Sequence, residues 1–147
     1  MRFQQIIIIA LTAFVILLGG CRATYRNVSG ESPYKERIGQ VCGVVTPIRA
    51  HGYTFKLERD KKTDAISIWN PGFTGPEVTF IVSLQPDTKM ILLEARECTN
   101  CRFDRYPEYR VQVIPEPNEF GGKPAYLRST MLASQYLRCT GGGSSVP

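Results

Sequence analysis

The chain has 147 residues, with 18 lysines and arginines against 13 aspartates and glutamates, which gives a net charge of +5 at pH 7. This length is enough for one domain with a single modest hydrophobic core. The positive charge is mild, so the composition does not argue for nucleic acid as a partner, although it is compatible with anionic polymers or lipid head groups. No segment after residue 21 is long and apolar enough to span a membrane.

The chain begins with a short apolar block. Arg2 provides a positive start, and residues 6–18 are almost entirely apolar. A membrane-spanning helix takes about 20 residues, so this block is too short to cross and instead has the length of a signal-peptide h-region. It ends in Leu18-Gly19-Gly20-Cys21, which resembles the lipobox of bacterial lipoproteins.

This resemblance implies that residues 1–20 are a signal peptide and that the Cys21 thiol receives a diacylglyceryl group. Two acyl chains give stable anchoring, because each buried CH₂ contributes about 0.8 kcal/mol. In Gram-negative lipoproteins an Asp directly after the cysteine tends to retain the protein in the inner membrane. Arg22 stands there in this chain, so the resemblance implies the outer membrane, with the protein facing the periplasm. The alternative is an uncleaved N-terminal anchor with an incidental cysteine.

The rest of the chain divides into three parts. Residues 21–37 are polar and without periodicity, which predicts a tether between the lipid and the domain. Residues 38–139 are expected to form a single β domain. The tail, residues 140–147, is rich in glycine and serine and is expected to be disordered.

Short segments within the domain have the composition or the alternation of β-strands. They are residues 41–46, 53–58, 66–69, 77–84, 89–97 and 109–113. Residues 127–137 are ambiguous, because Leu132, Ala133, Tyr136 and Leu137 have helical spacing. This rhythm predicts a mainly β fold, a small antiparallel barrel with at most one short C-terminal helix. The hairpin 77–84 to 89–97 is similar to that of an SH3-like barrel; an OB-like barrel and an open β-sandwich are the alternatives.

The cysteines favour export to an oxidising compartment. With Cys21 lipidated, four remain, and two disulfides are expected. We favour Cys42–Cys139 with Cys98–Cys101, because the first and last strands of small barrels often lie side by side. The crossed pairing Cys42–Cys98 with Cys101–Cys139 stays open. A zinc site usually needs two closely spaced ligand pairs and the chain has one, so no metal or other cofactor is expected.

Catalytic motifs are sparse. Cys98-Thr99-Asn100-Cys101 resembles the C-x-x-C of thiol–disulfide oxidoreductases, and Arg102 and Arg105 would lower a thiolate pKa there. Pro107 would break the helix that such a site needs, which favours a structural bridge. His51 is the single histidine, and the chain contains no G-x-S-x-G nucleophile elbow. The sequence therefore does not indicate an enzyme.

Two stretches are candidates for ligand binding. Trp69 and Phe73 flank the turn Asn70-Pro71-Gly72, and rigid aromatic rings on a loop give contact area at low entropic cost. Their alternative role is to fold back over the domain as part of its core. Arg102, Arg105 and Arg110 alternate with aromatic residues and would meet phosphates, anionic cell-wall polymers or an acidic partner, unless they form a solvated face.

These observations lead to one expected function and two alternatives. We expect a non-enzymatic outer-membrane lipoprotein whose β domain binds a protein or another cell-envelope component. The first alternative is an inhibitor or immunity lipoprotein against a cell-wall-degrading enzyme. The second is a periplasmic thiol oxidoreductase that uses Cys98 and Cys101.

The lipobox makes a direct prediction about covalent structure. The intact mass of the protein extracted from membranes should correspond to a chain that begins at Cys21 and carries added acyl groups. A Cys21→Ser variant should lack the acyl mass. Material that begins at Met1 without added acyl mass would contradict the assignment.

Overall fold

The computed structural model describes residues 23–56, 62–102, 106–133 and 135–140. Within them the chain forms nine strands and two short 3₁₀ helices, and no α-helix. The strands are β1 (Tyr25–Asn27), β2 (Val41–Val44), β3 (Ile48–Tyr53), β4 (Ala65–Ile68), β5 (Val78–Leu84), β6 (Lys89–Cys98), β7 (Glu108–Ile114), β8 (Ala125–Arg128) and β9 (Leu137–Thr140). The 3₁₀ helices are η1 (Asn118–Phe120) and η2 (Ser129–Met131). The predicted mainly β class is confirmed.

All nine strands belong to one sheet, in the order β5-β3-β4-β8-β7-β6-β2-β9, and β1 adds to β6. The predicted antiparallel barrel, SH3-like or OB-like, is wrong in two respects. First, β4 and β8 are parallel, because β8 returns beside β4 only after the chain has passed through β5, β6 and β7. Second, the sheet does not close, since β5 pairs only with β3 and β9 only with β2 among the described strands.

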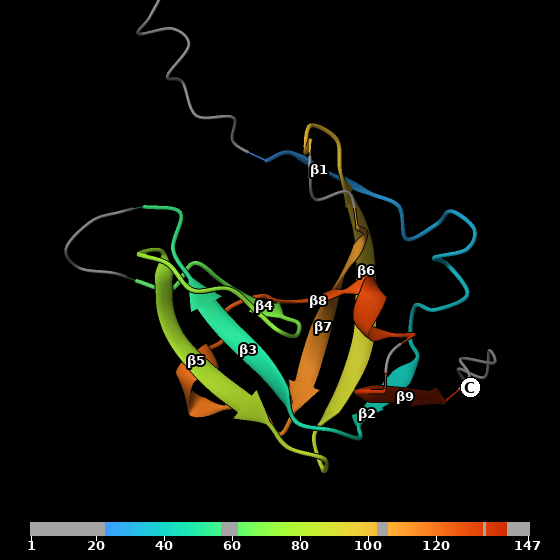
Figure 1. Ribbon diagram of the computed structural model, residues 1–147. Coiled ribbons are helices and arrows are strands. Elements are labelled where there is room, and N and C mark those ends of the chain that lie inside the picture. Colours follow the sequence, from blue (N-terminus) through green and yellow to red (C-terminus); the bar gives the residue numbers. More distant parts are fainter. Residues whose placement is uncertain (1–22, 57–61, 103–105, 134, 141–147) are drawn as a thin grey trace, which may run out of the picture.

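The sheet encloses its core by bending. Figure 1 shows the arm formed by β3 and β5 inclined toward the arm formed by β6 and β7. Side chains from both arms belong to a single hydrophobic core, among them Ile48 of β3, Leu84 of β5, Leu92 of β6 and Val113 of β7. Each of these four is at most 3% exposed. Strand alternation leaves the neighbouring side chains on the second face of the sheet.

Five of the predicted strands coincide with β2, β4, β5, β6 and β7. The predicted strand 53–58 is wrong, because β3 starts at Ile48 and ends at Tyr53. Polar side chains turn the chain just after it. The Asp64 carboxylate accepts a hydrogen bond from the Phe55 amide at 2.7 Å, and the Thr54 hydroxyl accepts one from the Lys56 amide at 3.1 Å. Residues 57 and 58 lie outside the described residues.

The C-terminal segment with helical spacing does not form an α-helix. Residues 127 and 128 end β8, η2 follows directly, and Leu137 starts β9. Leu137 is buried in the core, and Leu132 and Tyr136 pack against it, so these apolar side chains reach the core without an α-helix. The predicted disordered tail lies outside the described residues from position 141 onward.

The segment assigned to a tether is instead part of the domain. β1 pairs with the end of β6, Tyr25 opposite Cys98 and Asn27 opposite Arg96. Val28 is 1% exposed within the core. The ordered domain therefore begins well before residue 38, because this segment completes the β6 edge and the core beneath it. Residues 1–22, which include Cys21, lie outside the described residues, and no helix of the described chain is long and apolar enough to cross a membrane.

The two disulfides are Cys42–Cys139 and Cys98–Cys101, the pairing that the sequence favours. Cys42 of β2 lies directly opposite Cys139 of β9, so this bridge ties the edge strand β9 to its neighbour β2. Cys98 and Cys101 close a short loop after β6. The two bridges differ greatly in span, with sequence separations of 97 and 3.

This difference predicts unequal effects on stability. The chain-entropy model gives about 4.7 kcal/mol for the bridge of separation 97 and about 2 kcal/mol for the bridge of separation 3. The variant Cys42→Ala/Cys139→Ala should therefore lose at least twice as much free energy of unfolding as Cys98→Ala/Cys101→Ala in urea titrations. Equal losses of free energy of unfolding in the two variants would contradict the predicted difference between the two bridges.

Candidate functional site

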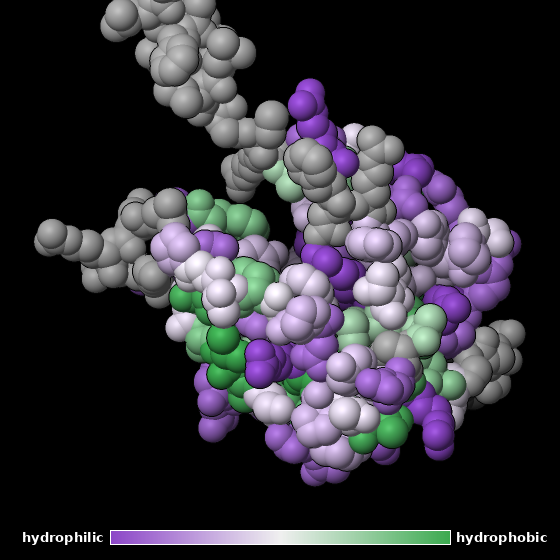
Figure 2. Space-filling view, in the orientation of Figure 1, coloured by the Kyte–Doolittle hydropathy of each residue, from purple (hydrophilic) through white to green (hydrophobic). Residues whose placement is uncertain are grey.

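The second face of the sheet carries a cavity of about 910 Å³. Its walls come from strands that are far apart in the sequence. They include Tyr25 of β1, Tyr53 of β3, Phe55, Arg96 of β6, Glu108 of β7 and Tyr126 of β8. Figure 2 shows the molecule indented between the lobe that carries the end of β3 and the part that carries β1. Aromatic rings with a few polar groups are typical of ligand and protein-binding sites.

Arg96 is the central polar group of this cavity. Its guanidinium carbon lies 3.9 Å from the ring centroid of Tyr25 and 3.3 Å from that of Tyr126, so the cation is sandwiched between two aromatic faces. Nη2 and Nε of Arg96 donate hydrogen bonds to Oε2 of Glu108 at 2.7 and 3.0 Å. Both charged side chains are largely shielded from water, at 16% and 17% exposed.

The sheet register explains why these groups meet. Arg96 lies directly opposite Glu108 in the β6–β7 pair. Tyr126 of β8 lies opposite Arg110, the second residue after Glu108 along β7, and therefore on the same face. β1 pairs with the other edge of β6 and brings Tyr25 over Arg96. Four strands thus converge on one guanidinium.

The electrostatics fix the protonation states in the cavity. Burial disfavours the charge on Arg96, but the hydrogen bonds and the negative charge of Glu108 outweigh it and raise the pKa of the guanidinium. Burial, with a smaller effect of the Glu108 charge, raises the pKa of the Tyr53 hydroxyl to about 12. The site therefore presents a permanent cation and a neutral phenol at any physiological pH.

The rim of the cavity is aromatic and carries charges of both signs. Phe55 is 65% exposed and meets Tyr53 edge to face, with ring centroids 5.4 Å apart. Lys56 and Asp64 line the same opening. A hydrogen bond from the Phe55 amide lowers the pKa of Asp64, which keeps this carboxylate ionised. Phe55 therefore adds exposed apolar area at the edge of the cavity.

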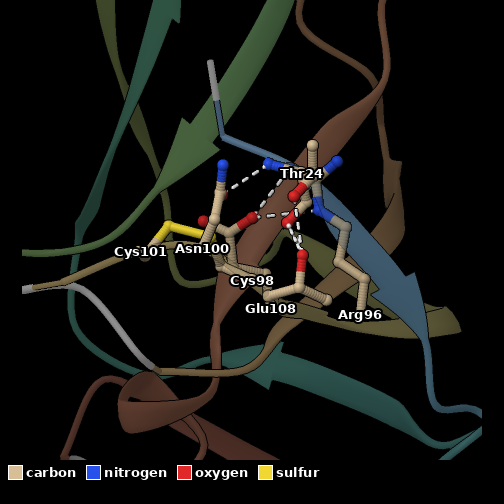
Figure 3. The surroundings of a disulfide bond; sticks show 7 residues. Thr24, Arg96, Cys98, Asn100, Cys101 and Glu108 are labelled. Atoms are coloured by element: carbon tan, nitrogen blue, oxygen red, sulfur yellow. Dashed lines mark hydrogen bonds and ion pairs between the residues drawn. A yellow bond between two sulfur atoms is a disulfide. The ribbon is translucent and has the colours of Figure 1, made fainter. Parts of the chain in front are cut away.

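The N-terminal segment forms one side of the cavity and is held by the Cys98–Cys101 loop. Ala23 lines the opening. The Thr24 amide donates to Oδ1 of Asn100 at 2.8 Å, and the Thr99 amide donates to the Thr24 carbonyl at 2.9 Å (Figure 3). The C-x-x-C loop therefore holds the start of β1 in place through hydrogen bonds. In the described structure no α-helix follows its first cysteine.

The aromatic loop that the sequence singles out lies against the sheet. The Arg128 guanidinium carbon stands 3.9 Å from the ring centroid of Trp69. Phe73 stacks on His51, with centroids 5.2 Å apart and planes at 25°, and meets Tyr53 edge to face. Trp69 and Phe73 are thus partly buried: Trp69 packs against the hydrophobic core, and Phe73 contacts Tyr53 of the cavity wall.

Gly72 allows this close approach. Its φ of +84° favours glycine, and a Cβ at this position would lie 2.1 Å from Cε1 of His51. The loop therefore closes directly over the imidazole.

Two of the three candidate arginines, Arg102 and Arg110, lie within the described residues, and neither lines the cavity. Arg110 of β7 pairs with Glu94 of β6, with Nε and Oε2 3.5 Å apart. Arg102 is exposed just after the disulfide loop, and Arg105 lies outside the described residues. The arginine at the cavity is Arg96, which the sequence does not single out, because only the pairing of β1, β7 and β8 around β6 brings its partners together.

His51 is buried beneath this loop, at 1% exposed, and its Nδ1 has no hydrogen-bond partner among the described residues. Burial lowers the pKa of the imidazole, and the charge of Arg49 lowers it further, against the raising effect of a hydrogen bond with the Ser67 backbone. The described residues contain no group of three or more His, Cys, Asp or Glu that would hold a metal ion.

Comparison of the chain with protein-family models, with curated proteins and with solved structures finds no significant match. The chemistry of the cavity therefore carries the functional assignment.

The buried imidazole predicts a pH dependence of stability. A base whose folded pKa is lowered stays neutral in the fold but takes up a proton when unfolded, so stability is full above the unfolded pKa of about 6.5 and falls as the pH drops through it. The midpoint of urea unfolding should decrease between pH 7.5 and pH 5.5. A His51→Gln variant should show a flatter profile in this window, and an unchanged slope in that variant would contradict the burial of a neutral His51.

Proposed function

We propose that the protein is an outer-membrane lipoprotein, anchored through Cys21 and facing the periplasm, whose β domain binds another envelope protein at the membrane surface. The observation that carries this proposal is the aromatic cavity that opens beside Ala23, two residues from the lipid attachment site. The lipobox and the disulfides of the domain support export to the envelope.

The position of the cavity favours a partner in the same membrane. Two extended residues span at most about 7 Å, so the opening at Ala23 lies close to the acyl chains on Cys21. A ligand in this cavity therefore sits near the lipid surface. A segment of a membrane-embedded or membrane-anchored protein is available at that depth, which favours it over a cell-wall polymer.

The chemistry of the cavity favours a polypeptide. Tyr, Phe and Arg are enriched at protein–protein interfaces, and Tyr and Arg in particular form the well-packed, desolvated anchors of binding hot spots. Phe55 at the rim offers apolar area, and Arg96 with Glu108 is a preorganised polar pair that orders the floor. Lys56 and Asp64 supply charges of both signs for the polar rim.

Photocrosslinking from the cavity tests this proposal in intact cells. A photoreactive phenylalanine analogue at position 55 of the full-length protein should yield a cross-link to a defined protein of the same membrane. The same analogue at position 114, an exposed apolar position at the opposite end of β7 from Glu108, serves as the matched control and should not.

Mutation of the same position gives the energetic test. Phe55→Ser should weaken binding to the cross-linked partner by about tenfold, the loss of a typical anchor worth about 1.4 kcal/mol. Ile114→Ser should leave the affinity unchanged. Identical products from positions 55 and 114, or Phe55-dependent co-sedimentation with purified cell-wall sacculi in place of a protein cross-link, would contradict the proposed partner.

A further inference from the structure

The two residues enclosed by the Cys98–Cys101 bridge both hold Thr24. The Thr24 amide donates to Oδ1 of Asn100 at 2.8 Å, and the hydroxyls of Thr24 and Thr99 lie 2.6 Å apart. The Thr24 carbonyl accepts from the amide and from the hydroxyl of Thr99, at 2.9 and 3.2 Å. Four hydrogen bonds thus join one residue of the N-terminal segment to the loop that the disulfide closes (Figure 3).

The bridge constrains the position of these two residues. β6 ends at Cys98, so Thr99 and Asn100 lie in the loop after it, and both are exposed. The disulfide closes a ring around them with a sequence separation of 3. Sγ of Cys98 lies 3.5 Å from Oδ1 of Asn100, the same atom that accepts the Thr24 amide. Breaking the S–S bond frees the backbone of both loop residues, and ordering them again to hold Thr24 costs conformational entropy.

The same bridge is open to a reagent from solution. Cys98 and Cys101 are both partly exposed and line a surface hollow of about 370 Å³. The other bridge differs, because Cys42 is 0% exposed and Cys139 packs against the hydrophobic core. Exposed disulfides exchange readily with thiols, whereas buried structural bridges resist reduction.

The two bridges also differ in how easily they re-form. Cys42 and Cys139 lie directly opposite each other in paired strands, so the fold keeps their sulfurs together even when the S–S bond is broken. Cys101 lies in the loop after β6, so its thiol moves away from Cys98 once the bond is broken. Holding two reacting groups together favours the bond between them, so the loop bridge is the easier one to reduce.

We propose that Cys98–Cys101 is a site of reversible thiol–disulfide exchange, and that its reduction releases Thr24 from the cavity wall. The reductant is an external dithiol. One of its thiolates attacks a sulfur of the bridge, the S–S bond breaks, and a mixed disulfide forms. The second thiolate displaces the protein sulfur, which leaves two protein thiols and one oxidised dithiol. Two electrons pass to the bridge, and the two protons of the dithiol end on the protein thiols.

Release of Thr24 alters the cavity, because its neighbours Ala23 and Tyr25 both line the cavity. Other contacts hold the far end of the segment. The Val28 amide donates to the Ala95 carbonyl at 2.9 Å, and Val28 is 1% exposed. Reduction therefore loosens the start of the segment and leaves its buried end in place. This proposal concerns the protein alone and depends neither on the lipid nor on the partner of the cavity.

Redox titration of the full-length protein tests the exchange. The protein is equilibrated with mixtures of reduced and oxidised dithiothreitol, the free thiols are alkylated, and peptide masses report each bridge separately from Cys21. Cys98–Cys101 should be half reduced at a ratio of reduced to oxidised dithiothreitol about tenfold lower than Cys42–Cys139 requires. The second bridge is thus the internal control.

Amide hydrogen exchange tests the release of Thr24. With only the loop bridge reduced, the Thr99 amide should lose about tenfold in protection, because its acceptor is the Thr24 carbonyl. The Val28 amide and the amides between β3 and β5 should keep theirs. The variant Cys98→Ser/Cys101→Ser cannot form the bridge and should show the same pattern.

The coupling between loop and segment is reciprocal, so contacts that Thr24 makes with the oxidised loop oppose its reduction. Thr24→Val removes the hydroxyl contact with Thr99 and should lower the dithiothreitol ratio at half reduction by about threefold. Thr63→Val is the matched control. Its hydroxyl lies 2.7 Å from that of Thr79 on β5, so its loss should leave the ratio unchanged.

Each result supports or overturns the proposal. Equal midpoints for the two bridges, or reduction of Cys98–Cys101 only as the protein unfolds, would overturn the exchange site. Unchanged protection of Thr99 in the reduced protein, or lost protection across the whole sheet, would overturn the release of Thr24. Equal shifts in Thr24→Val and Thr63→Val would overturn the coupling. Easier reduction of the loop bridge, a local loss of protection and a shift specific to Thr24 together support the proposal.

Discussion

The rest of the structure depends on the contacts that hold the side chain of Arg96. One guanidinium is stacked between the rings of Tyr25 and Tyr126 and hydrogen bonded to Glu108, so a single side chain joins four strands. A charge this shielded is stable only when it is paired and fully engaged, which ties the position of β1 to that of β7 and β8. The cavity exists because these strands are held in that relation.

This arrangement makes the N-terminal segment part of the binding site. In place of a tether, residues 23–28 form a strand and a buried contact, and the Cys98–Cys101 loop clips Thr24 in place. The point where the chain leaves the domain toward Cys21 is therefore also one wall of the cavity. The cavity wall at Ala23 is two residues from Cys21, the proposed site of lipidation, which is why we propose a partner at the membrane surface.

Sequence patterns recovered what depends on local physics and missed what depends on pairing across the chain. Strands such as 77–84 and 89–97 were predictable because alternation is local. The even number of cysteines predicted two disulfides, and the expectation that the first and last strands lie side by side favoured the pairing that is observed. The parallel pairing of β4 with β8 produces no recognisable pattern in the local sequence, so the predicted antiparallel barrel was wrong. The sequence did not distinguish Arg96 from the other arginines, because its neighbouring residues do not indicate that it contacts Tyr126 or Glu108. Trp69 and Phe73 drew attention as loop aromatics, yet their partners are on the sheet.

The most direct test of this account is amide hydrogen exchange at two of the hydrogen bonds that hold the N-terminal segment, from the Val28 amide to the Ala95 carbonyl and from the Thr99 amide to the Thr24 carbonyl. In an Arg96→Met variant both amides should lose protection while those between β3 and β5 keep theirs. Arg110→Met, which removes an exposed ion pair, should change neither. Unchanged protection of Val28 and Thr99 in Arg96→Met would show that Arg96 does not hold the N-terminal strand.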